Sequence, residues 1–172
     1  MKALISVYDK PSVLDLAKKL AERYEIIASD GTAKFLNENG IDAKTISEIV
    51  GIRQTNWIKT LHYKLYEMIF NGDIEIVVVD LYPFEEKQSI ENIDIGGVTL
   101  IRAAAKANCI VVSSKRQYKE VIDRLDSIDG EFKQKLIVEA FLRVAEYDVA
   151  IARWFASMFF PHKKTIAYNK FN

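Results

Sequence analysis

The run Ile74-Glu75-Ile76-Val77-Val78-Val79 is apolar at every position except Glu75, and all its apolar members are β-branched. Such a nearly continuous run is typical of a central parallel strand that is covered on both faces. Asn71-Gly72 precedes it as a helix end, and Leu81-Tyr82-Pro83-Phe84 follows it as a loop. This stretch predicts an α/β fold built around a buried parallel sheet.

Short apolar runs alternate with amphipathic segments on both sides of this strand. Further strands are predicted at residues 3–7, 25–28, 43–46 and 110–112. Helices are predicted at 11–21, 33–39, 63–70 and 96–107. One or two further helices are predicted at 131–160, ended by Pro161. A turn is predicted at 29–32 and a loop at 47–57. The alternation, without repeat or linker, predicts one α/β domain over 1–172, a doubly wound, mostly parallel sheet with additional C-terminal helices.

The overall charge argues against nucleic acid or a membrane as partner. The chain has 24 Lys plus Arg and 24 Asp plus Glu, so its formal net charge is zero. No global field then draws it to a polyanion, and an anionic ligand has to be held by a local site. No stretch is long and apolar enough to span a bilayer, and the N-terminus resembles a buried strand more than a signal peptide. We expect a cytoplasmic protein.

The metal-binding residue types are sparse. Cys109 is the single cysteine, and it adjoins an apolar run, which is typical of a small buried side chain. His62 and His162 are the two histidines and lie far apart in the sequence. No metal site is expected from this pattern.

Ligands of doubly wound sheets bind at the carboxyl ends of the strands, so the loops there are the first candidates. Ser29-Asp30-Gly31-Thr32 precedes a helix, and its hydroxyls and backbone N–H groups could cradle a phosphate with help from Lys10. The alternative is an ordinary turn with Thr32 as N-cap. Asp30 opposes the cradle, because a carboxylate about 5 Å from a phosphate charge costs about 3 kcal/mol at an effective dielectric of 20.

Two further segments carry polar side chains at the expected edge. Lys59-Thr60-Leu61-His62 precedes a helix, where Lys59 could meet a ligand or stay solvated above a capping Thr60. Tyr82 follows the central strand, where its phenol could donate to a substrate oxygen or simply pack.

The segment around Gly96-Gly97 combines a carboxylate with a helix start. Asp94 could cap this helix or face a ligand, and the two glycines permit either a tight turn or a close approach. Arg102 and Lys106 lie four residues apart and share one face of the same helix. The alternative for this cationic pair is that both side chains reach solvent.

Taken together, six segments in this order resemble the IMP cyclohydrolase domain of the bifunctional purine biosynthesis proteins. They are Ser6-Val7-Tyr8-Asp9-Lys10, Ser29-Asp30-Gly31-Thr32-Ala33-Lys34, Lys59-Thr60-Leu61-His62, Leu81-Tyr82-Pro83-Phe84, Asn92-Ile93-Asp94-Ile95-Gly96-Gly97 and Arg102-Ala103-Ala104-Ala105-Lys106. The resemblance implies a methylglyoxal-synthase-like fold that needs no cofactor. It also implies a purine nucleotide substrate, a homodimer and a separate formyltransferase partner, since the second domain of that family has no counterpart here.

The resemblance implies that this domain closes the formamido-carboxamide ribonucleotide to inosine monophosphate (IMP) with loss of water. The implied catalytic residues are Lys59, Tyr82, Asp94 and Lys106. The implied phosphate and ribose end is Tyr8, Asp9, Lys10, Ser29, Asp30, Gly31 and Thr32, and the residues implied around the base are Trp57, Ile58, Thr60, Asp80, Ile95, Gly96 and Gly97.

These residue types suit an intramolecular attack of a carboxamide nitrogen on a formyl carbon. Our hypothesis assigns the proton transfer to Lys106 and the orientation of the carboxamide to Asp94. Lys59 and Tyr82 would hold and polarise the formyl oxygen, on which negative charge grows.

Three positions depart from the family pattern. Asp30 replaces a glycine in the phosphate turn, Trp57 replaces an arginine, and Tyr63 replaces a proline. Trp57 could stack on the base or cover the loop. The loss of positive charge near a phosphate favours one alternative, a ligand-sensing module without catalysis. Another alternative is a methylglyoxal synthase, which would share the phosphate turn.

Overall fold

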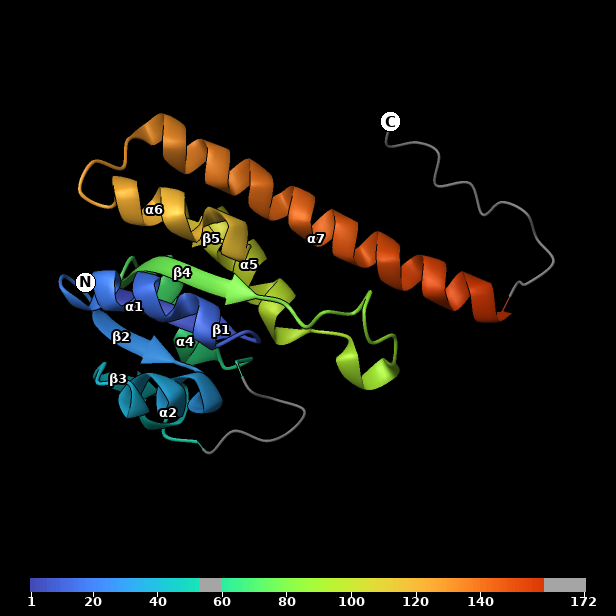
Figure 1. Ribbon diagram of the computed structural model, residues 1–172, viewed down its shortest axis with the longest axis horizontal. Helices are drawn as coiled ribbons and strands as arrows, with labels where there is room; N and C mark the ends of the chain where they lie inside the picture. The colour runs from blue at the N-terminus through green and yellow to red at the C-terminus, as the bar shows by residue number, and fades with distance from the viewer. Residues whose placement is uncertain (53–59, 160–172) are drawn as a thin grey trace.

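The computed structural model describes residues 1–52 and 60–159. Five parallel strands form one sheet in the order β3-β2-β1-β4-β5 (Figure 1). The strands are β1 (Lys2–Val7), β2 (Glu25–Ala28), β3 (Ala43–Thr45), β4 (Ile74–Asp80) and β5 (Ile110–Val112). The prediction of a doubly wound parallel sheet is confirmed.

The described helices connect and cover these strands. The α-helices are α1 (Leu14–Ala21), α2 (Asp30–Glu38), α3 (Ile46–Val50), α4 (Tyr63–Phe70), α5 (Gly96–Lys106), α6 (Tyr118–Arg124) and α7 (Gly130–Phe159). Three 3₁₀ turns are η1 (Pro11–Val13), η2 (Ile90–Asn92) and η3 (Lys115–Gln117). The long C-terminal segment is thus one helix as far as Phe159, and the predicted end at Pro161 lies outside the described residues.

The central position of β4 follows from its composition. β4 pairs with β1 from Ala3↔Ile76 to Val7↔Asp80 and with β5 on its other side. Ile76, Val77 and Val78 are fully buried, as a strand covered on both faces requires. The chain leaves β1 toward β2 and later leaves β4 toward β5, so the direction of winding reverses between β1 and β4.

Helices cover both faces of the sheet. Right-handed crossovers place α1 and α2 over β1, β2 and β3, and α6 packs beside α1. On the opposite face α4 and α5 pack together over β4. Helix α7 packs on α5 and β5, and its C-terminal part extends past the sheet (Figure 1).

The structure corrects two sequence predictions near β2 and β3. Helix α2 begins at Asp30 with Ser29 as N-cap, three residues before the predicted start, so Thr32 is inside the helix rather than at its cap. Residues 46–50, predicted mostly as loop, form α3. Thr45 and Glu48 make a capping box there, and Gly51 ends the helix with a φ of 77°.

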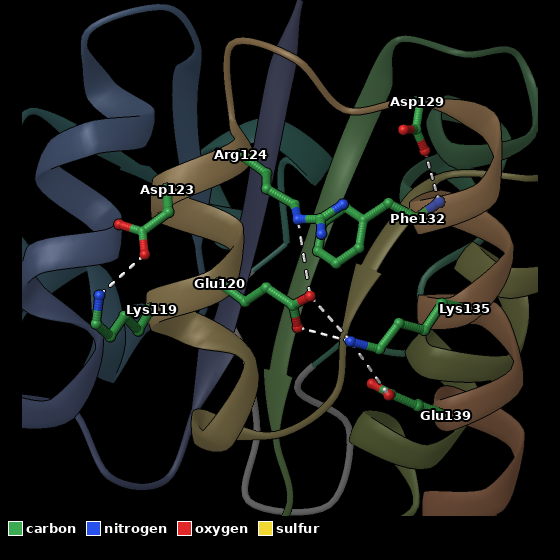
Figure 2. A network of polar contacts seen from close by, with 8 residues as sticks. All are labelled: Lys119, Glu120, Asp123, Arg124, Asp129, Phe132, Lys135 and Glu139. Carbon is green, nitrogen blue, oxygen red and sulfur yellow. Dashed lines mark hydrogen bonds and ion pairs between the residues drawn. The ribbon is translucent and has the colours of Figure 1, made fainter.

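A network of charged side chains joins α6 to α7 (Figure 2). Lys135 Nζ lies 2.7 Å from Glu120 Oε2, and the Asp129 carboxylate accepts a hydrogen bond of 2.7 Å from the Phe132 N–H at the start of α7. The Arg124 guanidinium lies over the Phe132 ring at 4.7 Å. These contacts fix the first turns of α7 against the domain.

Candidate functional site

The carboxyl ends of β1 and β4 meet at the point where the winding of the sheet reverses, which is where doubly wound folds bind ligands. The Tyr8 N–H donates to the Asp80 carbonyl oxygen at 3.2 Å, and the Asp9 N–H donates to Asp80 Oδ2 at 3.0 Å. The rings of Tyr8 and Tyr82 meet edge to face with 5.6 Å between centroids. The structure therefore brings four predicted site residues together at one edge.

The two carboxyl groups at this edge have different electrostatic surroundings. Burial raises the pKa of Asp80, against the opposing effect of the Asp9 N–H. The pKa of Asp9 is lowered, chiefly by a hydrogen bond from Lys115, whose Nζ lies 3.1 Å from Asp9 Oδ2. Asp9 is thus stabilised as an anion, whereas Asp80 is the carboxyl group that takes up a proton more readily.

Sequence reasoning missed two lysines at this edge. Lys115 follows β5 after Ser113 and Ser114, and Lys87 Nζ donates to the Tyr8 hydroxyl at 3.2 Å from the loop after β4. The position of Lys115 after a predicted strand was the one available signal for it. No local pattern distinguished Lys87.

The start of α2 and the loop after β1 form one cradle. The Ser29 hydroxyl donates to Thr32 Oγ1 at 3.0 Å, and Thr32 Oγ1 donates to the Val7 carbonyl oxygen at 3.4 Å. A Cβ atom built on Gly31 would lie 3.6 Å from Lys10 Cε, so the Lys10 side chain passes directly over this turn. A lysine thereby meets the N-terminus of a helix, an arrangement suited to a phosphate.

The carboxylate of Asp30 does not point into this cradle, where its charge would repel a bound phosphate. Its Oδ2 accepts a hydrogen bond of 2.7 Å from the hydroxyl of Ser47 in α3. The carboxylate is therefore directed toward α3, while the Asp30 backbone stays in the first turn of α2.

The start of α5 forms the other end of the site. Asp94 Oδ1 accepts a hydrogen bond of 2.7 Å from the Gly97 N–H, so the predicted capping role of Asp94 is present. The Asp94 N–H in turn donates to the Tyr147 hydroxyl at 2.8 Å. A Cβ on Gly97 would lie 2.6 Å from Asp94 Oδ2 and 2.8 Å from Leu81 Cδ2, which shows how closely this helix approaches the loop after β4.

Two buried hydroxyl groups lie beside this helix start. Thr60 is 3% exposed and its Oγ1 presses against Gly96, which has no room for a side chain there. Thr60 Oγ1 and the Tyr66 hydroxyl find no hydrogen-bond partner in the part of the chain that is described. Burial and the charge of Asp94 raise the pKa of Tyr66, a residue that sequence reasoning missed. Ile95, between Asp94 and Gly96, is 59% exposed.

Lys106 is not part of this edge. It is the last residue of α5, and its Nζ lies 5.9 Å from the centre of the Phe70 ring at the end of α4. Cys109, three residues later, donates from its thiol to the carbonyl oxygen of Ile74, the first residue of β4. Because α5 rises about 1.5 Å per residue, about 15 Å separate Lys106 from Gly96. The structure therefore does not bring Lys106 and Asp94 together, and the catalytic role assigned to Lys106 stays a prediction.

The remaining predictions for the site concern Trp57, Ile58 and Lys59, which lie outside the described residues.

No group of three or more His, Cys, Asp and Glu side chains suited to a metal occurs within residues 1–52 and 60–159. Nor does any helix there have the length and apolar character to cross a membrane.

A hollow of about 500 Å³ lies away from this edge. Its walls include Lys18, Tyr24, Glu25 and Lys44, and Glu25 is the first residue of β2. The hollow is therefore at the amino end of the strands, opposite the edge at which α2 and α5 begin.

The fold and this edge define a doubly wound α/β domain with a polar site at its switch point. Residues 12–113 match the sequence model of the MGS-like domain, which covers more than half of the chain. The chain belongs to the MGS-like domain family. Residues 103–172 match a second model, that of the AICARFT/IMPCHase bienzyme.

Curated relatives extend the similarity along nearly the whole chain. The chain is 35% identical to the bifunctional purine biosynthesis protein PurH of Oenococcus oeni over 201 residues, covering 98% of this chain and 40% of the relative. It is 37% identical to the PurH of Fusobacterium nucleatum, and the matched region covers 99% of this chain and 40% of that relative. The chain thus spans about 40% of the length of these relatives.

A solved structure described as the crystal structure of ForH superposes with a TM-score of 0.74 at 24% identity. The superposition covers 91% of this chain and 97% of that one. At this identity the likeness shows the fold alone.

Proposed function

We propose that this chain acts in purine biosynthesis as an IMP cyclohydrolase, closing the formamido-carboxamide ribonucleotide to IMP. The observation that carries the proposal is that two helices, α2 and α5, both begin at the carboxyl edge of the sheet, one on each face. Lys10 crosses the start of α2, Asp94 and Thr60 contact the start of α5, and Tyr82 follows Leu81, whose side chain also approaches that helix start. The similarity to bifunctional purine biosynthesis proteins supports the choice of substrate.

The start of α2 would bind the phosphate of the substrate, and the start of α5 would bind its base. The phosphate would accept hydrogen bonds from the N–H groups at the start of α2 and from Lys10, where the helix dipole favours an anion. The imidazole, with its carboxamide and formamide groups, would then reach toward Asp94 and Tyr82. Holding both reacting groups together supplies much of the rate gain, because the reaction is intramolecular.

The reaction itself needs one bond formed and one water lost. The carboxamide nitrogen attacks the formyl carbon, and the formyl oxygen gains negative charge that the Tyr82 hydroxyl and Lys59 would stabilise. The Asp94 carboxylate would accept a hydrogen bond from the attacking amide. The tetrahedral carbon then loses its oxygen as water, and the second purine ring is complete.

Proton transfer requires a group other than Lys106 of the same chain. Asp80 is the proposed group, since it lies at the switch point two residues before Tyr82 and burial raises the pKa of its carboxyl group. A carboxyl group that is shifted toward neutral pH can exchange protons with a reacting nitrogen or oxygen more effectively than an ordinary one.

The direct test is turnover of the formylated ribonucleotide, followed by the absorbance of IMP. We expect formation of IMP well above the uncatalysed rate. Asp94→Asn keeps an oxygen for the Gly97 N–H and removes the charge, so it should lower kcat strongly without lowering the melting temperature. Binding of IMP without turnover by the unmodified chain would refute the proposal and support a ligand-sensing module.

A further inference from the structure

The buried face of α7 ends in a residue that carries a polar group. Its members follow one another at spacings of four and finally three residues: Phe132, Leu136, Ala140, Val144 and Tyr147. The first four are apolar, whereas Tyr147 is 4% exposed and so brings a hydroxyl into the interior. A phenylalanine would fill the same space without needing a hydrogen-bond partner. The partners of this hydroxyl therefore show what the tyrosine contributes.

The Tyr147 hydroxyl pairs with two backbone groups of the segment that precedes α5. It donates to the Asn92 carbonyl oxygen at 3.0 Å and accepts from the Asp94 N–H at 2.8 Å. Burial raises the pKa of Tyr147, so the hydroxyl keeps the proton that it donates. The Asp94 carboxylate in turn accepts from the Gly97 N–H. The backbone of Asp94 is thus held by α7 and its side chain by α5.

The ring of Tyr147 contacts the loop that carries another predicted site residue. It meets the Phe84 ring edge to face, with 6.2 Å between centroids, and Phe84 is 1% exposed. The Phe84 N–H donates to the Tyr82 carbonyl oxygen at 2.8 Å. The loop after β4 therefore lies beside the C-terminal half of α7 (Figure 1). One side chain of α7 contacts both the segment of Asp94 and the loop of Tyr82.

We propose that Tyr147 is a positioning residue for Asp94: its hydroxyl holds the backbone of residues 92–94 so that the Asp94 carboxylate is oriented for ring closure. This inference rests on the proposed function, in which Asp94 accepts a hydrogen bond from the attacking amide. Without the hydroxyl, the Asp94 N–H and the Asn92 carbonyl group lose a buried partner, and the segment can shift. A displacement of about 1 Å in a reacting arrangement can lower the rate about 100-fold.

Tyr147→Phe tests this role, because it removes the hydroxyl and keeps the ring that packs on Phe84. We expect kcat to fall about 10- to 100-fold. KM should change little, because the phosphate is held at the start of α2, which Tyr147 does not contact. Tyr24→Phe is the matched control, since it removes a half-buried tyrosine hydroxyl at the amino end of the strands. This control should leave kcat unchanged.

The number of IMP sites per chain, measured by calorimetry, separates positioning from loss of folded protein. Tyr147→Phe should bind as many IMP molecules per chain as the unmodified chain. An unchanged kcat would overturn the proposal. So would a fall in kcat that is fully matched by a fall in the number of sites.

Hydrogen exchange in the ligand-free chain tests the same contact without any turnover. The Asp94 amide should exchange about 10-fold faster in Tyr147→Phe, because it loses its buried acceptor. The Cys109 amide, which donates to the Ala104 carbonyl oxygen at 2.9 Å beyond the other end of α5, should exchange equally in both chains. Equal exchange at Asp94 would overturn the proposal. Faster exchange at Asp94, in a protein whose unmodified chain forms no IMP, would leave Tyr147 as the residue that positions Asp94 and would refute the proposed function alone.

Discussion

Lys10 is the side chain that links the loop after β1 to the start of α2. Replacing it with alanine should weaken IMP binding about 10- to 100-fold, because a charged hydrogen bond contributes about 1.5–3 kcal/mol. Isothermal calorimetry measures this directly. Lys34→Ala, which removes an exposed lysine farther along α2, is the matched control. Inosine, which lacks the phosphate, should bind both variants like the unmodified chain; an equal loss for inosine would contradict a phosphate role for Lys10.

The ionisation of the Asp80 carboxyl group should make the stability of the folded chain depend on pH. Because its pKa is raised in the folded state, the folded chain holds the proton more tightly than the unfolded chain. This residue therefore stabilises the fold less as pH rises from the ordinary aspartate pKa through the raised value. Asp80→Asn, which still accepts from the Asp9 N–H, should melt at a higher temperature than the unmodified chain at pH 7. This difference in melting temperature should vanish at a pH below the ordinary aspartate pKa. The same difference at pH 7 and at that lower pH would refute the raised pKa of Asp80.

At the residue scale, sequence reasoning identified side chains but not their directions. It placed Asp30 in the phosphate turn and treated its charge as an obstacle. The hydrogen bond to Ser47 depends on α3, which was not predicted, so the direction of the carboxylate could not be foreseen. Lys106 was assigned to the site by resemblance, although a helix that begins at the edge of the site carries its last residue to the far end of the sheet.

At the element scale, α5 depends on a glycine that brings it against the loop after β4. Gly97→Ala would place a methyl group 2.6 Å from Asp94 Oδ2 and 2.8 Å from Leu81 Cδ2. We expect a loss of about 1–3 kcal/mol in the free energy of unfolding, the usual range for overpacking, measured by urea denaturation. Gly130→Ala is the control, since its added Cβ meets nothing within 4 Å. Similar stability changes in the two variants would show that the close approach is not needed.

The elements differed in how readily their sequences could be interpreted. β4 was predicted because an almost unbroken run of β-branched residues is typical of a parallel strand that is buried on both faces. Helix α3 was missed because five residues are too few to show a helical period, and its capping box, Thr45 with Glu48, was the one local signal. The start of α2 was placed too late because a residue in a predicted turn, Asp30, forms the first turn of the helix.

At the scale of the whole molecule, alternating strands and helices were sufficient to predict a doubly wound sheet. The strand order β3-β2-β1-β4-β5 was not predicted, because it depends on pairing between distant segments. That order makes β1 and β4 neighbours, and it therefore decides that Tyr8, Asp9, Asp80 and Tyr82 share one edge. Lys87 and Lys115 join them from two further segments for the same reason.

A crystal structure of the complex with IMP would test the proposed site by locating the bound nucleotide. We predict that the phosphate lies at the start of α2 within hydrogen-bonding distance of Lys10, and that the base lies beside Asp94 and Tyr82. A nucleotide in the hollow lined by Lys18 and Lys44, at the amino end of the strands, would contradict it.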